Sequence, residues 1–304
     1  MSRKKPATAT GVLVINKHEG VTSHTIVSIL RRLYDMSQIG HTGTLDPMAT
    51  GVLPVLLGRA AKASDFVMAE DKEYVAEMTL GVTTDTQDTT GKVISVSDAV
   101  PPAEKVYEAC RRFVGEIYQI PPMYSAIKIG GRKLCDAARS GEVIEREPRK
   151  ITVFSVEPER LSEKSYRLKI VCSKGTYVRT LCHDIGEYLG CGAAMSSLCR
   201  TRSGPFTLDG AYTTEQIERM PFEERLTLPL PTESLFEGYP EVELGDFFAK
   251  LAKSGAAIFQ KKIGTSFAEG TAVKIKHRGE LIALGKVLEL DGASAIKPIK
   301  MFVI

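Results

Sequence analysis

The chain has 304 residues, of which 43% are hydrophobic and 25% charged, and its formal net charge is +3. This length allows one large domain or two ordinary ones, and the composition is that of a soluble globular protein with a sizeable core. No apolar run approaches the roughly 18 residues of a membrane span. The basic start lacks the apolar stretch of a secretory signal, so we expect a cytoplasmic protein.

Hydrophobic periodicity predicts the first elements. Residues 12–15 have the pattern of a strand, and residues 24–34 have that of a helix capped by Thr22 or Ser23. Residues 74–80 alternate between apolar and polar side chains, which predicts a strand that is buried on one face.

Between the first helix and this strand lies a turn-rich loop, Gly40-His-Thr-Gly-Thr-Leu-Asp46-Pro-Met-Ala-Thr-Gly51. Pro47 pushes Asp46 towards an extended conformation, and the glycines allow positive φ and close backbone approach. The loop therefore holds a carboxylate and the imidazole of His41 in a shaped turn. Residue types alone leave two interpretations, a catalytic loop or an ordinary turn with an Asp-Pro cap.

Later elements follow without a regular alternation of strand and helix. We expect a polar loop at 85–91, a helix opened by Pro101-Pro102, strands at 151–156 and 166–171, and a helix at 176–189. Several strands in succession between scattered helices favour an α+β fold with a mixed, largely antiparallel sheet.

Two segments differ in character from the rest. Residues 128–150 hold seven basic and four acidic residues and are predicted to form an inserted arm with a short helix at 133–139. Beyond about residue 240, strands at 271–276, 280–285 and 295–304, joined by turns at His277-Arg-Gly-Glu280 and Asp291-Gly292, predict a small β-rich unit.

The charge and the cysteines carry less information. Residues 250–304 have a local charge of +6, from ten basic and four acidic residues. Such segregation suggests a polyanionic partner, although lysine-rich tails are often only solubilising. The six cysteines include no Cys-x-x-Cys pair. The cluster of Cys182-His183, Cys191 and Cys199 fits no zinc pattern, so we predict no metal site and buried cysteines in a reducing compartment.

Several motifs in order give a more specific indication. They are the Asp46 loop, Gly11-Val-Leu-Val-Ile-Asn-Lys17 before it, and Lys72-Glu-Tyr74, Pro121-Pro-Met-Tyr-Ser-Ala-Ile-Lys128, Gly175-Thr-Tyr177-Val-Arg179 and Leu198-Cys-Arg-Thr-Arg-Ser-Gly204 after it. Over about residues 11–210 the chain resembles the bacterial tRNA pseudouridine synthases that modify uridine 55 of the T loop. The resemblance implies the pseudouridine synthase fold, with a catalytic domain at 1–235, an RNA-binding arm at about 121–150, and a PUA-like RNA-binding domain at 240–304.

The resemblance also assigns the chemistry. Asp46 matches the catalytic aspartate, which can act as a nucleophile or ion stabiliser in cleavage of a glycosidic bond. Arg179 matches the arginine paired with that aspartate, and a guanidinium would orient the carboxylate and keep it ionised. Isomerisation needs no redox change or energy input. The chain has no nucleotide-binding motif, so we expect no cofactor.

The remaining assignments concern substrate binding. Tyr74 and Tyr177 match aromatic residues of the base pocket, and Leu198 matches an apolar residue packed against the base. The hydroxyl of Tyr74 could also lie near the reacting atoms, so we count this residue among the catalytic ones. His41 would fill the space that the extruded uridine leaves, and Lys17 would support the catalytic loop or contact phosphate.

Two positions depart from the family pattern: His18 stands where proline is usual, and Cys135 where tyrosine is common. These departures put the local backbone and the packing of the arm in doubt, but not the chemistry. The expected partner is the T-arm stem-loop of tRNA, for a monomer that needs no protein partner and no membrane. Two alternatives stay open, a subunit of a guide-RNA pseudouridine synthase and a non-catalytic module that helps tRNA to fold.

Overall fold

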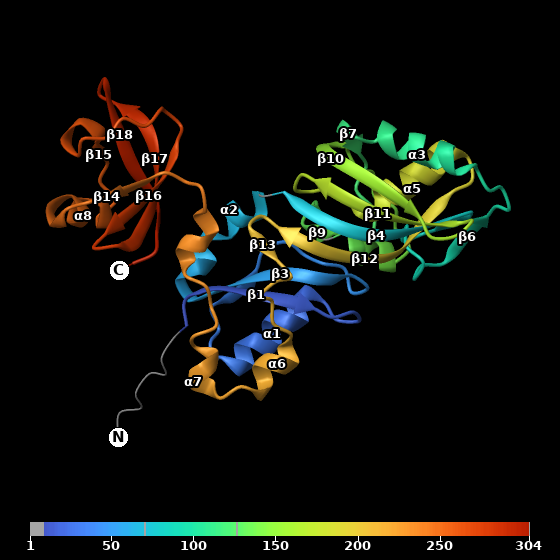
Figure 1. The fold of residues 1–304 in the computed structure, drawn as a ribbon, viewed down its shortest axis with the longest axis horizontal. Coiled ribbons are helices and arrows are strands. Elements are labelled where there is room, and N and C mark those ends of the chain that lie inside the picture. Colours follow the sequence, from blue (N-terminus) through green and yellow to red (C-terminus); the bar gives the residue numbers. More distant parts are fainter. Residues whose placement is uncertain (1–8, 70, 126, 304) are drawn as a thin grey trace.

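The computed structural model describes residues 9–69, 71–125 and 127–303. These residues form a nine-stranded sheet, a separate five-stranded sheet near the C-terminus, and two small hairpins (Figure 1). Among the described helices, none combines the length and the apolar character that crossing a membrane requires.

The large sheet is mixed but mostly antiparallel. Its strands are β1 (Gly11–Lys17), β2 (Ile39–His41), β3 (Thr50–Leu57), β4 (Lys72–Leu80), β7 (Gly115–Gln119), β10 (Arg149–Arg160), β11 (Ser165–Cys172), β12 (Ala193–Ser203) and β13 (Phe206–Thr207). The main order is β1-β3-β12-β4-β11-β10-β7, and β3 with β12 is its only parallel pair among the described strands. The predicted fold class is confirmed.

Helices flank this sheet at both ends. They are α1 (Ser23–Leu33), α2 (Ser64–Ala69), α3 (Ala103–Arg112), α5 (Val178–Leu189), α6 (Thr214–Arg219) and α7 (Phe222–Arg225), with short 3₁₀ turns η1 (Gly58–Ala63) and η2 (Thr232–Phe236). Of the two caps predicted for α1, Thr22 is the N-cap, and its hydroxyl accepts a hydrogen bond from the Thr25 N–H, whereas Ser23 is the first helical residue. Helix α1 contacts β2 and α6 contacts β1, while α3 contacts β10 and α5 contacts β12 (Figure 1).

Two central strands, β3 and β12, were not among the elements predicted from periodicity. β12 lies between β3 and β4 and begins Ala193-Ala-Met-Ser-Ser, so it shows no clean alternation of apolar and polar side chains. The predicted helix at 176–189 begins at Val178 instead, because Tyr177 keeps an extended conformation as the N-cap of α5.

The arm is inserted between β7 and β10, which are antiparallel neighbours at one edge of the sheet. It contains the hairpin of β8 (Lys128–Ile129) and β9 (Arg132–Lys133), followed by α4 (Leu134–Arg139). The short helix predicted in this region is confirmed, one residue later than expected. A second hairpin, β5 (Val82–Thr84) with β6 (Val93–Val96), encloses the predicted polar loop at 85–91.

The five-stranded sheet confirms the β-rich character predicted for the C-terminal segment. Its elements are β14 (Glu241–Glu243), α8 (Asp246–Lys253), β15 (Ile258–Phe259), η3 (Gln260–Lys262), β16 (Ala272–His277), β17 (Glu280–Leu290) and β18 (Ala293–Met301). Both predicted hairpin turns have positive φ at their two central residues, at Arg278 and Gly279 and at Asp291 and Gly292. This is the geometry that a two-residue type I′ turn requires.

The small sheet does not stand free of the large one. Phe302 and Leu284 share an apolar cluster with Val12 and Val52 of the large sheet. Phe236 lies within the cluster, with its ring centroid 5.6 Å from that of Phe302. Buried aromatic side chains contribute much of the packing energy of a core, so this apolar contact helps to hold the two sheets together.

Candidate active site

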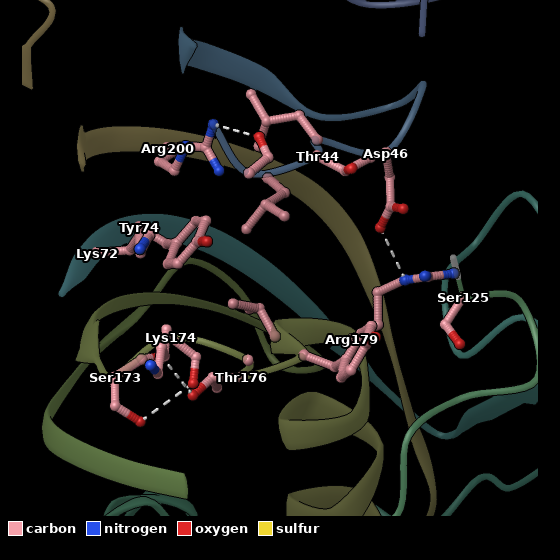
Figure 2. A pocket seen from close by; sticks show the side chains of 16 residues that line it. Thr44, Asp46, Lys72, Tyr74, Ser125, Ser173, Lys174, Thr176, Arg179 and Arg200 are labelled. Carbon is pink, nitrogen blue, oxygen red and sulfur yellow. Dashed lines mark hydrogen bonds and ion pairs between the residues drawn. The ribbon is translucent and has the colours of Figure 1, made fainter. Parts of the chain in front are cut away.

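A cavity of about 300 Å³ opens where the 40–51 loop meets β4, β12 and the N-terminus of α5 (Figure 2). Five of the seven residues singled out from the sequence line it, namely Asp46, Tyr74, Tyr177, Arg179 and Leu198. His41 and Lys17 lie outside its wall. The fold therefore brings together residues that are widely separated in the sequence.

The loop that carries Asp46 is held by buried side chains. The Ser23 hydroxyl accepts a hydrogen bond from the Leu45 N–H at 2.9 Å and donates one to the Leu45 carbonyl at 3.2 Å. Gly51 has φ +101°, and a Cβ there would lie 2.3 Å from the carbonyl oxygen of Arg200. Only glycine therefore fits at the point where the loop enters β3.

Arg179 joins three segments behind the cavity. Its Nε lies 3.0 Å from Oδ2 of Asp46, and its Nη1 lies 3.3 Å from Oδ2 of Asp88 in the β5–β6 loop. Its Nη2 donates a hydrogen bond to the carbonyl of Tyr124, at the base of the arm. The guanidinium is buried, whereas 35% of the Asp46 side chain is exposed. The buried guanidinium of Arg179 thus holds the Asp46 carboxylate at the cavity wall.

Burial raises the pKa of Asp46 above its usual range, and the positive charge of Arg179 opposes this rise. The negative charge of Asp88 adds to it. The ion pair therefore offsets only part of the cost of burying the carboxylate. Acid conditions should protonate Asp46 at a higher pH than an ordinary aspartate.

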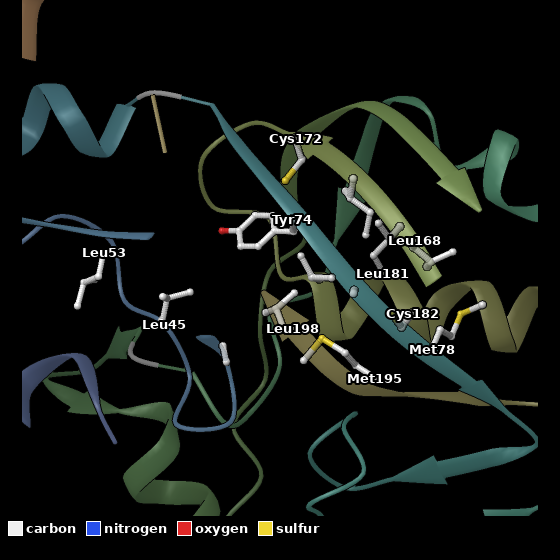
Figure 3. Close-up of a cluster of buried hydrophobic side chains, with 14 of the residues drawn as sticks. Leu45, Leu53, Tyr74, Met78, Leu168, Cys172, Leu181, Cys182, Met195 and Leu198 are labelled. Carbon is white, nitrogen blue, oxygen red and sulfur yellow. The ribbon is translucent and has the colours of Figure 1, made fainter. Parts of the chain in front are cut away.

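Apolar and aromatic side chains form the other side of the cavity. Tyr74 on β4 and Leu198 on β12 extend from the hydrophobic core, and Figure 3 shows the Tyr74 hydroxyl directed towards Leu45 of the loop. Tyr177 contributes a half-buried ring from the N-cap of α5. Burial raises the pKa of both tyrosines, so each carries a neutral hydroxyl near pH 7. Such a surface can stack on a flat base and hydrogen-bond to it.

Lys17 is fully buried. Its ammonium donates hydrogen bonds to the carbonyls of His18, Val21 and Pro47, and burial lowers its pKa to about 8. Pro47 directly follows Asp46, so this geometry favours support of the loop over contact with phosphate.

His41 ends β2 and is partly buried. Burial and the nearby charge of Arg200 lower the pKa of His41, which leaves a neutral imidazole at pH 7. It lies at the start of the loop, outside the cavity wall.

Gln119, at the end of β7, forms hydrogen bonds with both backbone polar groups of Tyr177 and so acts as a clamp. Its Oε1 accepts a hydrogen bond from the Tyr177 N–H at 2.8 Å, and its Nε2 donates one to the Tyr177 carbonyl at 3.1 Å. Gln119 is buried. This clamp holds the first turn of α5, and with it Arg179, against the edge strand from which the arm departs.

Gln119→Leu should lower the single-turnover rate by roughly 10- to 100-fold, because a small displacement of Tyr177 and Arg179 spoils the positions of the reacting groups. Gln119→Glu, which retains the acceptor but loses the donor, should fall between this variant and the wild type. Rates and thermal midpoints measured together separate displacement from unfolding. A folded Leu variant with a rate within twofold of the wild type would contradict the role of the clamp.

Three residues of the site were missed from the sequence: Asp88, Gln119 and Arg200. Asp88 lies in a predicted polar loop whose other members are equally polar, and Gln119 lies just before the motif that begins at Pro121, without a charge to mark it. Arg200 belongs to the motif that begins at Leu198, but no role was predicted for it. In the described part of the chain, no three His, Cys, Asp or Glu side chains gather as a metal site would require.

Comparison with known proteins identifies the family. A sequence description of the TruB family pseudouridylate synthase N-terminal domain matches residues 31–178, and one of the tRNA pseudouridylate synthase B C-terminal domain matches residues 179–236. The tRNA pseudouridine synthase B of Clostridium tetani is 40% identical over 277 residues, which are 91% of this chain and 95% of the relative. That of Alkaliphilus oremlandii is 46% identical over 220 residues, 72% of this chain and 74% of the relative.

The fold is also similar to that in a crystal structure of a Cbf5-Nop10-Gar1 complex. The TM-score is 0.75 at 29% identity, over 97% of this chain and 85% of the other. With identity of 40% to a curated relative over nine tenths of its length, this chain belongs to the TruB family of pseudouridylate synthases.

Proposed function

We propose that this protein isomerises uridine 55 in the T loop of tRNA to pseudouridine. The observation that carries the proposal is the Asp46 carboxylate, held 3.0 Å from the Arg179 guanidinium at the wall of a cavity lined by Tyr74 and Leu198. The names of the relatives support tRNA as the substrate.

The reaction replaces the bond between the sugar and N1 of the base with a bond between the sugar and C5. The C1′–N1 bond breaks, a C1′–C5 bond forms, a proton leaves C5 and one is added to N1, so no electrons are gained or lost overall. Asp46 supplies an oxygen nucleophile or an ion stabiliser for this exchange. The second carboxylate, Asp88, is buried behind Arg179 and does not line the cavity. It is not placed to activate water, which argues against ordinary hydrolysis.

The target base must leave the stacked T loop to enter the cavity. Extrusion of a base costs a few kcal/mol, which contacts in the cavity and a substitute in the stack can offset. Tyr74, Tyr177 and Leu198 supply the contacts, and the neutral imidazole of His41 supplies the substitute. Asp46 follows His41 by five residues, so one loop carries both the filler and the reactive carboxylate.

The isolated protein and an unmodified tRNA transcript test the proposal. Uridine labelled with tritium at C5 should release tritium as pseudouridine forms, and mapping of the modified position should give residue 55 alone. A transcript with cytidine at that position should release none. Modification elsewhere would overturn the choice of site. No modification until a guide RNA and partner proteins are added would favour a subunit of a guide-RNA enzyme.

We assign RNA affinity, rather than chemistry, to the C-terminal segment from about residue 240, as a PUA-like unit that acts within a monomer. Four of its basic residues, Lys274, Lys276, Arg278 and Lys300, are already in ion pairs with carboxylates. Among the described residues, six exposed lysines form no such pair, namely Lys250, Lys253, Lys261, Lys262, Lys286 and Lys297. These are available to phosphate.

Changing these six lysines to glutamine should weaken tRNA binding and flatten its salt dependence, by roughly 0.7 to 0.9 log units per log salt for each phosphate that is no longer neutralised. A minimal T-arm hairpin should still react at saturating enzyme, because the proposed site residues all precede residue 200. Substitution is a cleaner test than truncation, which would expose Phe236. Unchanged affinity and slope would show that this unit does not bind RNA.

A further inference from the structure

Arg200 is a buried charge on the cavity wall whose role the proposed chemistry leaves open. It lies on β12, is 1% exposed and lines the same cavity as Asp46. Its Nε donates a hydrogen bond to the Val52 carbonyl at 2.7 Å, and its Nη2 donates one to the Gly43 carbonyl at 3.2 Å. The arginine therefore ties β12 to both ends of the loop that carries Asp46.

The guanidinium has no carboxylate partner among the ion pairs of the described residues, in contrast to Arg179, which has two. Burial of an unpaired charge is costly, and arginine cannot avoid the cost by losing its proton. Two carbonyl groups compensate for part of it. A neutral side chain of similar length would fill this space at a lower electrostatic cost, so the retained charge requires a further explanation.

Tyr74 provides that explanation. Arg200 and Tyr74 are direct antiparallel partners on β12 and β4, so their side chains lie on the same face of the sheet. Burial raises the pKa of Tyr74, and the positive charge of Arg200 opposes that rise. Figure 2 shows the two side chains together on one side of the cavity, opposite the pair of Asp46 and Arg179.

We propose that Arg200 is a positioning residue that acts through the Tyr74 hydroxyl. A guanidinium is positively charged and only donates hydrogen bonds, so the phenol oxygen should face it and the hydroxyl hydrogen should point elsewhere. The orientation of this hydroxyl towards the bound base is thereby fixed, in register with the Asp46 loop that Arg200 also holds. The inference rests on the proposed function, because it assumes that Tyr74 meets the target uracil.

A double-mutant cycle tests this coupling. Arg200→Lys keeps the charge but not the fork of donors, and should lower the single-turnover rate at least tenfold in a protein that still binds tRNA. In a Tyr74→Phe background, which lacks the hydroxyl, the same change should cost at least threefold less, and the loss that remains comes from the bonds of Arg200 to the loop. Arg202→Lys, on the same strand but outside the cavity wall, is the matched control and should cost less than twofold in both backgrounds. An equal loss from Arg200→Lys in both backgrounds would overturn the proposal.

A second measurement does not depend on catalysis. With 3-fluorotyrosine at position 74, the fluorine resonance reports the titration of the hydroxyl. Arg200→Lys should move the titration upward by roughly half a pH unit or more, because a weaker donor stabilises the phenolate less, whereas Arg202→Lys should leave it in place. An unchanged titration would refute the contact. If the wild type forms no pseudouridine, the proposed function fails, while this titration still tests the pair of Arg200 and Tyr74.

Discussion

Asp46→Asn should abolish isomerisation while leaving tRNA affinity within about tenfold of the wild type. Asparagine keeps the shape of the side chain but lacks the oxygen anion, and removal of a catalytic nucleophile can cost up to about a millionfold in rate. Binding should survive because phosphate contacts, which lie elsewhere, dominate affinity for RNA. Single-turnover tritium release and filter binding on the same preparation measure both quantities.

Asp88→Asn is the matched control for this variant. Asp88 contacts the same arginine but does not line the cavity, so its loss should slow the reaction without abolishing it. Since the charge of Asp88 raises the pKa of Asp46, its removal should also move the acid limb of the rate profile to lower pH. Measurable turnover by Asp46→Asn, in protein free of wild-type carry-over, would rule out the nucleophile assignment.

Arg179→Lys should lose most of the activity, by roughly a hundredfold, although it keeps the positive charge. The guanidinium meets Asp46, Asp88 and the Tyr124 carbonyl simultaneously through its planar fork, which the single ammonium of lysine cannot reproduce. The Asp46 carboxylate would then lose both its orientation and part of its stabilisation. Rate constants at saturating enzyme, compared with the wild type across a range of pH, measure the two effects.

The Arg179→Lys variant should also have a shifted pH dependence, and the direction of the shift follows from the pKa of Asp46. In the proposed reaction the active form of Asp46 is the carboxylate, which is lost as the pH falls through its pKa. Arg179 lowers that pKa against the larger effect of burial, so a weaker partner should let it rise. The acid limb for Arg179→Lys should therefore lie at higher pH than in the wild type, opposite to the shift expected for Asp88→Asn. A rate and an acid limb of the pH profile like those of the wild type would mean that the planar guanidinium of Arg179 is not needed.

The sequence alone predicted the features that depend on local chemistry. The cap of α1 at Thr22 or Ser23, the buried alternation of β4 and the positive-φ turns of the small sheet each require particular residues at short spacing. Motif order also pointed to Asp46, Arg179 and the family, because a few reactive side chains in fixed succession are a more specific signal than any single turn. These features needed no knowledge of which strands are neighbours.

Tertiary structure decided which side chains meet. β12 lacks a regular alternation because its pairing with β4 shifts register twice, yet its position between β3 and β4 brings Leu198 and Arg200 to the cavity. Asp88 and Gln119 belong to the site only because of tertiary contacts. The β5–β6 hairpin brings Asp88 to Arg179, and the edge strand β7 brings Gln119 to Tyr177. Such contacts arise from strand order and register over long sequence separations, which short-range periodicity does not encode. The sequence thus indicated the candidate reactive groups and the family, and the fold determined how those groups are held.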